Sequence, residues 1–300
     1  MHIPDGYLSP STCTVLYAGA TPFWFIALKR TQTALNARFV PLVSLVSAFS
    51  FVIMMFNLPL PGGTTGHAVG MAVSTIVLGP WASILAISVA LAIQAIFFGD
   101  GGITAYGANC FNMAIVGSLV SYVVYRTLAG RTTLTSPRRV FAAAVAGYFA
   151  INVAALCAAV EFGVQPVLFH DIAGSPLYAP YPLSIAVPAM LIGHLSFAGL
   201  AEGGLSAGVV VWLQRHEPML LTTTAPQALE SRGKEMEASG ILVSARKLWL
   251  GVAVLMVLTP LGLLATGTAG VTMSGAAGIA TLSGTNSYTG ATTITAGTLK

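Results

Sequence analysis

The residues with the most distinctive chemistry stand at the start of the chain, where His2 follows Met1. The terminal amine, the amide nitrogen of His2 and the ring nitrogen Nδ1 of His2 can close fused chelate rings around one metal ion. One place in a square plane then remains for another donor. Because a hydrophobic core requires nothing of this kind, the alternative is that His2 is an ordinary terminal residue.

A second candidate ligand is His67, which ends a segment rich in proline and glycine that starts at Pro59. Glycine allows the backbone to adopt positive φ angles and to approach a ligand closely. An imidazole is a suitable fourth donor for the chelate formed by Met1 and His2. Alternatively, His67 is an interfacial histidine that is hydrogen-bonded to its own loop.

The donor set restricts the metals that such a site can bind. A planar site made only of nitrogens, one of them a deprotonated amide, suits Ni²⁺ or Cu²⁺ and can accommodate Co²⁺. Zn²⁺ prefers a tetrahedral shell, and Mg²⁺ and Ca²⁺ prefer oxygen ligands. Since the ligands must lose protons, we expect the metal affinity to fall as the medium becomes acidic. These residues do not distinguish cobalt from nickel.

The elements that must position these residues are membrane helices. Of the 300 residues, 55% are hydrophobic and only 7% are charged, whereas a soluble domain has roughly 25% charged residues. Apolar runs of about 20 residues are long enough to cross a bilayer. We therefore predict an all-α polytopic membrane protein, a compact bundle of about seven helices plus one additional C-terminal transmembrane helix. The predicted spans are 11–28, 39–57, 68–79, 81–98, 103–125, 140–162, 184–213 and 248–266.

The basic residues indicate the topology. Of the 13 Lys and Arg residues, 12 fall in three segments between the predicted spans. All three segments lie on one side only if residues 68–98 cross the membrane twice, with a turn at Gly79 and Pro80. By the positive-inside rule this side is cytoplasmic, so the N-terminus and the loops of His67 and Asp100 face outward. The basic charge then requires no nucleic-acid partner. The first residues lack the pattern of a cleavable signal peptide, so we expect Met1 to remain the N-terminus.

Two polar residues flank the candidate ligands in the sequence. Asp5 could orient the ring of His2, or it could cap the first helix together with Ser9 and Ser11. Thr64 lies in the loop just before His67 and is a further candidate for supporting the metal ligands.

A third loop contains Asp100 between glycines, and Asn109 and Asn112 follow it. These side chains could support the N-terminal segment from above. Turn chemistry alone would also select aspartate before two glycines. Both interpretations stay open at this point.

His194 and Glu202 lie within an apolar span, where ionisable groups usually face the interior of the bundle. Their spacing corresponds to about two helical turns, so they can lie on similar faces. We expect structural pairing with each other or with neighbours in preference to metal ligation.

Several of these motifs together resemble the CbiM/NikM family, the substrate-binding (S) membrane components of energy-coupling factor transporters for cobalt and nickel. The resemblance extends from residue 1 to about residue 215 and is carried by residues 1–9, 61–67, 98–104, 107–109, 112–113, 193–194 and 202–203. It implies that the metal is held by the Met1 amine, the amide nitrogen and ring of His2, and His67.

The resemblance also implies location and partners. The protein is expected in the cytoplasmic membrane of a bacterium or archaeon, with Ni²⁺ or Co²⁺ as its transported ion and no prosthetic group. A coupling transmembrane subunit, ABC-type ATPase subunits, a small companion membrane subunit and membrane lipid are the implied partners. No Walker A motif is present in the sequence, so we predict a transporter subunit that has no ATPase motif of its own and is not an enzyme.

Two other functions are alternatives for a membrane protein of this composition. An intramembrane metalloenzyme would use His194 and Glu202, but no H-E-x-x-H motif supports it. An ATP-independent metal permease would be expected to show inverted repeats or paired intramembrane acids, and neither stands out.

The chain changes character after the metal-binding domain, which we assign to residues 1–215. Residues 216–245 are polar and are interpreted as a cytoplasmic linker. Residues 246–269 form an additional transmembrane segment that resembles the start of the companion subunit of the CbiN/NikN type. Residues 270–300 are a Gly- and Thr-rich tail that resembles one autotransporter-type repeat, and a single repeat is expected to be disordered.

Overall fold

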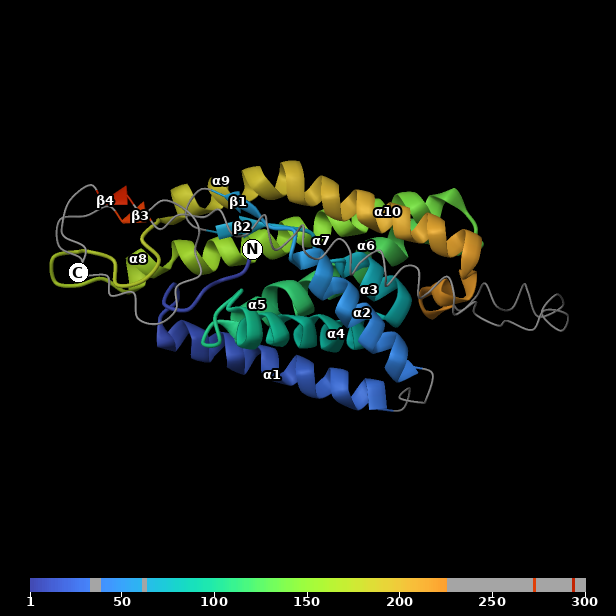
Figure 1. The fold of residues 1–300 in the computed structure, drawn as a ribbon, viewed down its shortest axis with the longest axis horizontal. Helices are drawn as coiled ribbons and strands as arrows, with labels where there is room; N and C mark the ends of the chain where they lie inside the picture. Colours follow the sequence, from blue (N-terminus) through green and yellow to red (C-terminus); the bar gives the residue numbers. More distant parts are fainter. Residues whose placement is uncertain (33–38, 61–63, 226–271, 274–292, 295–300) are drawn as a thin grey trace, which may run out of the picture.

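The computed structural model describes residues 1–32, 39–60, 64–225, 272–273 and 293–294. Within these ranges the protein is a bundle of helices with two short β-ribbons (Figure 1). Five continuous helical stretches are long and apolar enough to cross a membrane, which confirms the predicted all-α polytopic membrane fold. These stretches are Pro10–Gln32, Pro80–Phe98, Tyr106–Ala129, Pro137–Leu168 and Leu183–His216.

The first half of the chain supplies the elements nearest the N-terminus. They are α1 (Pro10–Gln32), α2 (Phe39–Met54), β1 (Leu58–Leu60), β2 (Thr64–Gly66), α3 (Met71–Leu78), α4 (Pro80–Ile93) and the π-helix η1 (Gln94–Phe98). β1 and β2 pair in antiparallel register, with Leu58 opposite Gly66 and Leu60 opposite Thr64. The segment before His67, which was predicted to be a loop, therefore includes a short β-ribbon.

The second half contains three of the five long helical stretches. Its elements are α5 (Tyr106–Asn109), the π-helix η2 (Cys110–Val116), α6 (Gly117–Ala129), α7 (Pro137–Gly163), α8 (Gln165–Leu168), α9 (Leu183–Gly193), the π-helix η3 (His194–Ala198), α10 (Gly199–His216) and the 3₁₀-helix η4 (Pro218–Thr224). Single π turns of this kind occur frequently at functional sites. The short strands β3 (Thr272–Met273) and β4 (Thr293–Ile294) pair in parallel.

One predicted span differs from the structure. Residues 68–79 were expected to form a membrane helix, but α3 has eight residues and is about 12 Å long, well short of the hydrocarbon thickness. The predicted reversal after it is confirmed: Gly79 has φ 80°, and Pro80 stands at the start of α4. All side chains of α3 are buried, because α2, α4, α6, α7 and α10 surround it.

The bundle has one basic end. Lys29 and Arg30 lie in the last turn of α1, Arg126 in the last turn of α6, and Arg215 in the last turn of α10. In Figure 1, α1 and α10 end at the right of the view, whereas the β1–β2 ribbon lies toward the left. The predicted transmembrane segment 246–269 and most of the linker and tail lie outside the described residues.

Candidate metal centre

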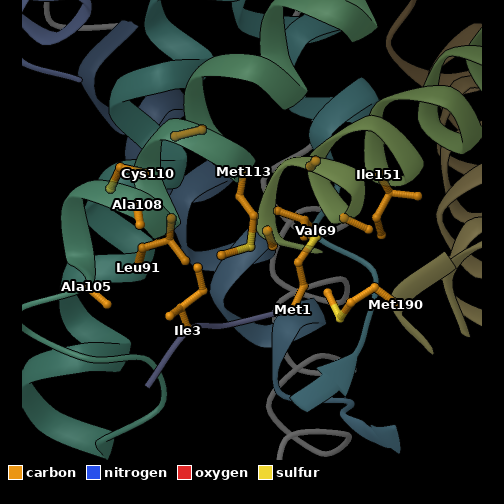
Figure 2. Close-up of a cluster of buried hydrophobic side chains, with 14 of the residues drawn as sticks. Met1, Ile3, Val69, Leu91, Ala105, Ala108, Cys110, Met113, Ile151 and Met190 are labelled. Atoms are coloured by element: carbon orange, nitrogen blue, oxygen red, sulfur yellow. The ribbon is translucent and has the colours of Figure 1, made fainter. Parts of the chain in front are cut away.

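The N-terminal segment is inserted into the bundle. Met1, His2 and Ile3 are 1%, 5% and 0% exposed. Figure 2 shows the side chain of Met1 beside Val69 and Met190 and the side chain of Ile3 beside Leu91, and all of these residues belong to one buried cluster. The apolar residues on either side of His2 therefore carry it into the interior. An ordinary, solvated terminal histidine is excluded by this burial.

The backbone next to His2 is fixed by Asn109. The amide of Ile3 donates to Oδ1 of Asn109 at 2.8 Å, and Nδ2 of Asn109 donates to the carbonyl oxygen of Ile3 at 3.1 Å. The same carbonyl oxygen accepts a bond from the amide of Gly102 at 2.8 Å. The side-chain amide of Asn109 thus pairs with both backbone groups of Ile3, in the way that a neighbouring β-strand would. These bonds fix the backbone directly after His2.

Asp5 neither orients the ring of His2 nor caps α1, the two roles expected from the sequence. Its carboxylate accepts hydrogen bonds from the amides of Ile103 and Thr104, at 3.1 and 2.8 Å, and a third from the hydroxyl of Thr104. Ser9 caps α1 instead, accepting a bond from the amide of Thr12 at 3.1 Å. Asp5 therefore joins the N-terminal segment to the loop that follows Asp100. A Cβ atom at Gly102 would overlap the carboxyl and the amide of Asp5, so only glycine fits there.

The rings of His2 and His67 lie face to face, with centroids 4.5 Å apart and planes inclined by 18°. His67 is 2% exposed. Its Nδ1 lies 3.1 Å from the carbonyl oxygen of Ala68, which only accepts, so Nδ1 carries the proton. Nε2 of His67 has no hydrogen-bond partner and holds a free lone pair.

The Met1 amine lies close to His67. It donates to the carbonyl oxygen of Thr65 in β2, and Oγ1 of Thr65 is 3.2 Å away. Burial lowers the pKa of this amine to about 5, although the charge of Asp100 opposes the shift. Burial, with the nearby Met1 amine and His2, also holds the pKa of His67 well below its usual value. At neutral pH both groups are thus uncharged bases with desolvated nitrogens.

Asp100 is the acidic group of this site. Its Oδ1 lies 3.3 Å from Nδ1 of His2, and its Oδ2 accepts a bond from Nδ2 of Asn57 at 3.3 Å. Burial disfavours its ionisation, but His2 and His67 outweigh this and hold the pKa of Asp100 below its ordinary value. The Asp100 side chain is 24% exposed, whereas the His2 side chain is 3% exposed. Asp100 therefore contacts the N-terminal segment and also reaches the surface of the protein.

His194 and Glu202 are both completely buried, but they have different partners. Nδ1 of His194 lies 2.8 Å from the carbonyl oxygen of Met190. Glu202 accepts hydrogen bonds from the backbone at the start of α3. Each residue therefore forms hydrogen bonds with its own neighbours, as expected for a structural role. His194 and Glu202 are not paired with each other.

The two remaining candidates have other partners. Asn112 donates to Oε2 of Glu161 at 2.8 Å and so bonds to α7 rather than to the N-terminal segment. Thr64 is paired with Leu60 in the ribbon. Thr65 and Asn57 could not be identified from the sequence, because a backbone carbonyl has no sequence signature and Asn57 lies far from Asp100 in the chain. Among the described residues, no group of three or more His, Cys, Asp or Glu side chains could hold a metal.

The fold and the buried nitrogen groups define a multi-pass membrane protein with a polar site formed around its own N-terminus. Residues 2–220 match the family described as "Cobalt uptake substrate-specific transmembrane region", and the chain belongs to this family. The CbiM-type resemblance predicted from the sequence is thereby confirmed.

Two kinds of relative agree with this assignment. The chain is 56% identical over 269 residues to the "Fused nickel transport protein NikMN" of Rhodobacter capsulatus, covering 90% of this chain and 74% of the relative. A solved structure described as "Crystal Structure of an transition metal transporter" is 45% identical, with a TM-score of 0.69, over 75% of this chain and 99% of that one. A truncated transition metal transporter is 47% identical at the same TM-score, over 72% of this chain and 99% of that one. The comparisons support metal transport as the general function.

Proposed function

We propose that this protein captures Ni²⁺ or Co²⁺ at the outer face of the cytoplasmic membrane and delivers it inward as the substrate-specific subunit of an ATP-driven energy-coupling factor transporter. The observation that carries the proposal is the convergence of Met1, His2 and His67 in one buried place. The family assignment and the similarity to a nickel transport protein support the same role.

The proposed ligands are four nitrogens: the Met1 amine, the deprotonated amide of His2, Nδ1 of His2 and Nε2 of His67. The neutral amine can donate an N–H to Thr65 and still offer its lone pair. The bond from Nδ1 of His67 to Ala68 likewise leaves Nε2 available. Such a set favours Ni²⁺ or Co²⁺ over Zn²⁺ or Mg²⁺.

Binding requires a local rearrangement. Nδ1 of His2 must leave Asp100, and the two rings must turn out of their face-to-face arrangement so that each points a nitrogen at the ion. His67 is attached to a ribbon and a helix, whereas His2 is attached to the N-terminal segment. We infer that the ring of His2 moves more than the ring of His67.

The orientation follows from the basic end of the bundle. Arg126 and Arg215 lie in the last turns of α6 and α10, and Arg138 lies in the first turn of α7. The positive-inside rule predicts that such a basic end is cytoplasmic. The N-terminus then faces outward, on the side from which the ion is captured.

The energy for metal uptake would come from partner subunits. The sequence has no Walker A motif, so a coupling transmembrane subunit and ABC-type ATPase subunits would drive uptake. Residues 1–215 would form the metal-binding domain. Residues 246–269, which would follow a cytoplasmic linker, resemble the start of the companion subunit, and the Rhodobacter capsulatus relative is described as a fused protein.

The first test is titration of the purified protein with Ni²⁺ while recording the yellow absorbance of square-planar Ni(II). Wild type should bind with this absorbance, and His67→Ala should weaken binding by at least about 100-fold because one of four ligands is lost. His216→Ala is the matched control, since His216 is exposed and stacks on Trp212 far along α10. Its affinity should equal that of wild type.

A second variant tests the terminal chelate. His2→Ala removes the ring nitrogen and with it one of the two chelate rings, so the planar absorbance should disappear. Vesicles with and without the ATPase partners then test the transport role. Strong accumulation of Ni²⁺ without ATPase partners would contradict the proposed subunit role, and unchanged affinity in His2→Ala would contradict the site.

A further inference from the structure

Glu202 of α10 binds the backbone that follows His67. Its Oε2 accepts hydrogen bonds from the amides of Val69 and Gly70, at 2.7 and 2.8 Å, and its Oε1 accepts one from the amide of Met71 at 2.6 Å. The side chain is 0% exposed. Three successive backbone amides are thus held by one carboxylate from a helix far along the chain.

These amides lie at the start of α3, since Val69 and Gly70 directly precede the helix and Met71 is its first residue, and this explains why an acidic residue is used. The first amides of a helix have no partner within it, and they form the positive end of its dipole. The residue before α3 is Gly70, which has no side chain to cap the helix. Glu202 supplies the missing acceptor through charge-assisted hydrogen bonds, which are stronger than neutral ones.

The same contacts constrain His67. Val69 is two residues after His67, and the backbone before His67 is already fixed because Gly66 pairs with Leu58 in the ribbon. Nδ1 of His67 is bound to the carbonyl oxygen of Ala68, which belongs to the same peptide unit as the Val69 amide that Glu202 holds. The direction of Nε2 therefore depends on a short segment fixed at one end by β1 and at the other by Glu202.

We propose that Glu202 is a positioning residue for the metal ligand His67 and that it couples α10 to the metal site. This inference rests on the proposed function. When α10 shifts relative to α3, the carboxylate carries the 69–71 backbone with it, and Nε2 of His67 moves relative to Met1 and His2. The ion is then held by three nitrogens in place of four. α10 ends at the basic side of the bundle, so this contact links the site to the opposite end of the fold.

The test is a double-mutant cycle in the purified full-length protein with Ni²⁺ alone as the probe. Glu202→Gln removes the charge and brings an NH₂ group toward backbone donors, so the Ni²⁺ dissociation constant should rise by at least about tenfold. Its Ni(II) absorbance should shift toward that of His67→Ala. In the His67→Ala background, Glu202→Gln should change the constant by less than about threefold, because its effect acts through His67.

Two further variants separate positioning from general damage. Glu161→Gln removes a carboxylate of α7 that accepts a bond from Asn112 and has no bond to residues 69–71, so its affinity and absorbance should match wild type. Glu202→Asp keeps the charge and should restore part of the lost affinity, and it also serves if Glu202→Gln does not fold.

The outcomes are distinct. An unchanged affinity and absorbance in Glu202→Gln, or an equal loss in both backgrounds, would overturn the inference. If wild type itself showed no planar Ni(II) absorbance, the proposed function would fail before the cycle began.

Discussion

The imidazoles of His2 and His67 are stacked with their centroids 4.5 Å apart, although one belongs to the N-terminal segment and the other follows β2. Stacked rings do not both direct a nitrogen at a common ion. Asp100 lies 3.3 Å from Nδ1 of His2 in this arrangement. The proposed metal ligands are therefore close together and buried, and one of the proposed donors lies beside a carboxylate.

The pH dependence of Ni²⁺ affinity should reflect the buried amine. A terminal amine with an ordinary pKa of 8.0 competes with the metal for its lone pair at neutral pH, but burial lowers the pKa of the Met1 amine to about 5. The amine is therefore already neutral, and its protonation weakens binding only as the pH falls through about 5. Between about pH 7 and pH 8 the logarithm of the affinity should rise with a slope of one, from the His2 amide proton alone. A slope of two in a Ni²⁺ titration series would contradict this, and the free tripeptide Met-His-Ile is the control expected to show it.

Asp100→Asn should slow metal capture. Asp100 is the partly exposed carboxylate beside the buried ligands, so it attracts a hydrated cation toward them. The association rate of Ni²⁺, measured by stopped-flow absorbance at low ionic strength, should fall about tenfold and lose most of its salt dependence. Asp171→Asn removes an exposed carboxylate that binds the amide of Ser175, and it should leave the rate unchanged. If both substitutions slowed Ni²⁺ association equally, the association rate would depend on the net charge of the protein and not on the position of Asp100.

Gly102→Ala should dislodge the N-terminal segment. The new Cβ would overlap the carboxyl and amide of Asp5, and overpacking of this kind costs about 1–3 kcal/mol. We expect a lower thermal unfolding midpoint and a Ni²⁺ affinity reduced by at least about tenfold, because His2 follows the displaced segment. Gly208→Ala is the control, since nothing lies near a Cβ at that position. A Gly102→Ala protein with wild-type affinity would show that the loop adapts without moving His2.

Asn109→Ala should weaken metal binding without touching a ligand. It removes both hydrogen bonds to Ile3 and leaves the amide of Ile3 buried and unpaired, which costs about 1–3 kcal/mol. The Ni²⁺ dissociation constant, measured by competition with a chelator, should rise about tenfold with an unchanged absorbance maximum, because the ligands themselves are intact. A shifted maximum would mean that Asn109 affects the ligand set directly.

Most of the spans could be predicted from the sequence because hydrophobic length is a local property. The apolar run of α1 and the reversal at Gly79 and Pro80 each follow from a few neighbouring residues. α3 could not be predicted in the same way. Its run is apolar along its whole length, but its start is set by Glu202, which comes from a different helix.

The candidate ligands show the same division. Their donor chemistry follows from residue type, so Met1, His2 and His67 could be named from the sequence. Asp5 was assigned to the wrong partners because its true acceptor role depends on Ile103 and Thr104 approaching from another loop. Side-chain contacts across a bundle leave no local pattern in the chain.

The sequence by itself determined the membrane character, the order of the spans, the basic end and the chemical identity of the candidate ligands, because these depend on composition and local spacing. Only the tertiary structure decided that the first three residues are buried and that His2 stacks on His67 and lies beside Asp100. It also decided that Glu202 holds the segment after His67. The physical reason is that burial and hydrogen-bond geometry arise from elements distant in the chain, and they are fixed only when those elements pack together.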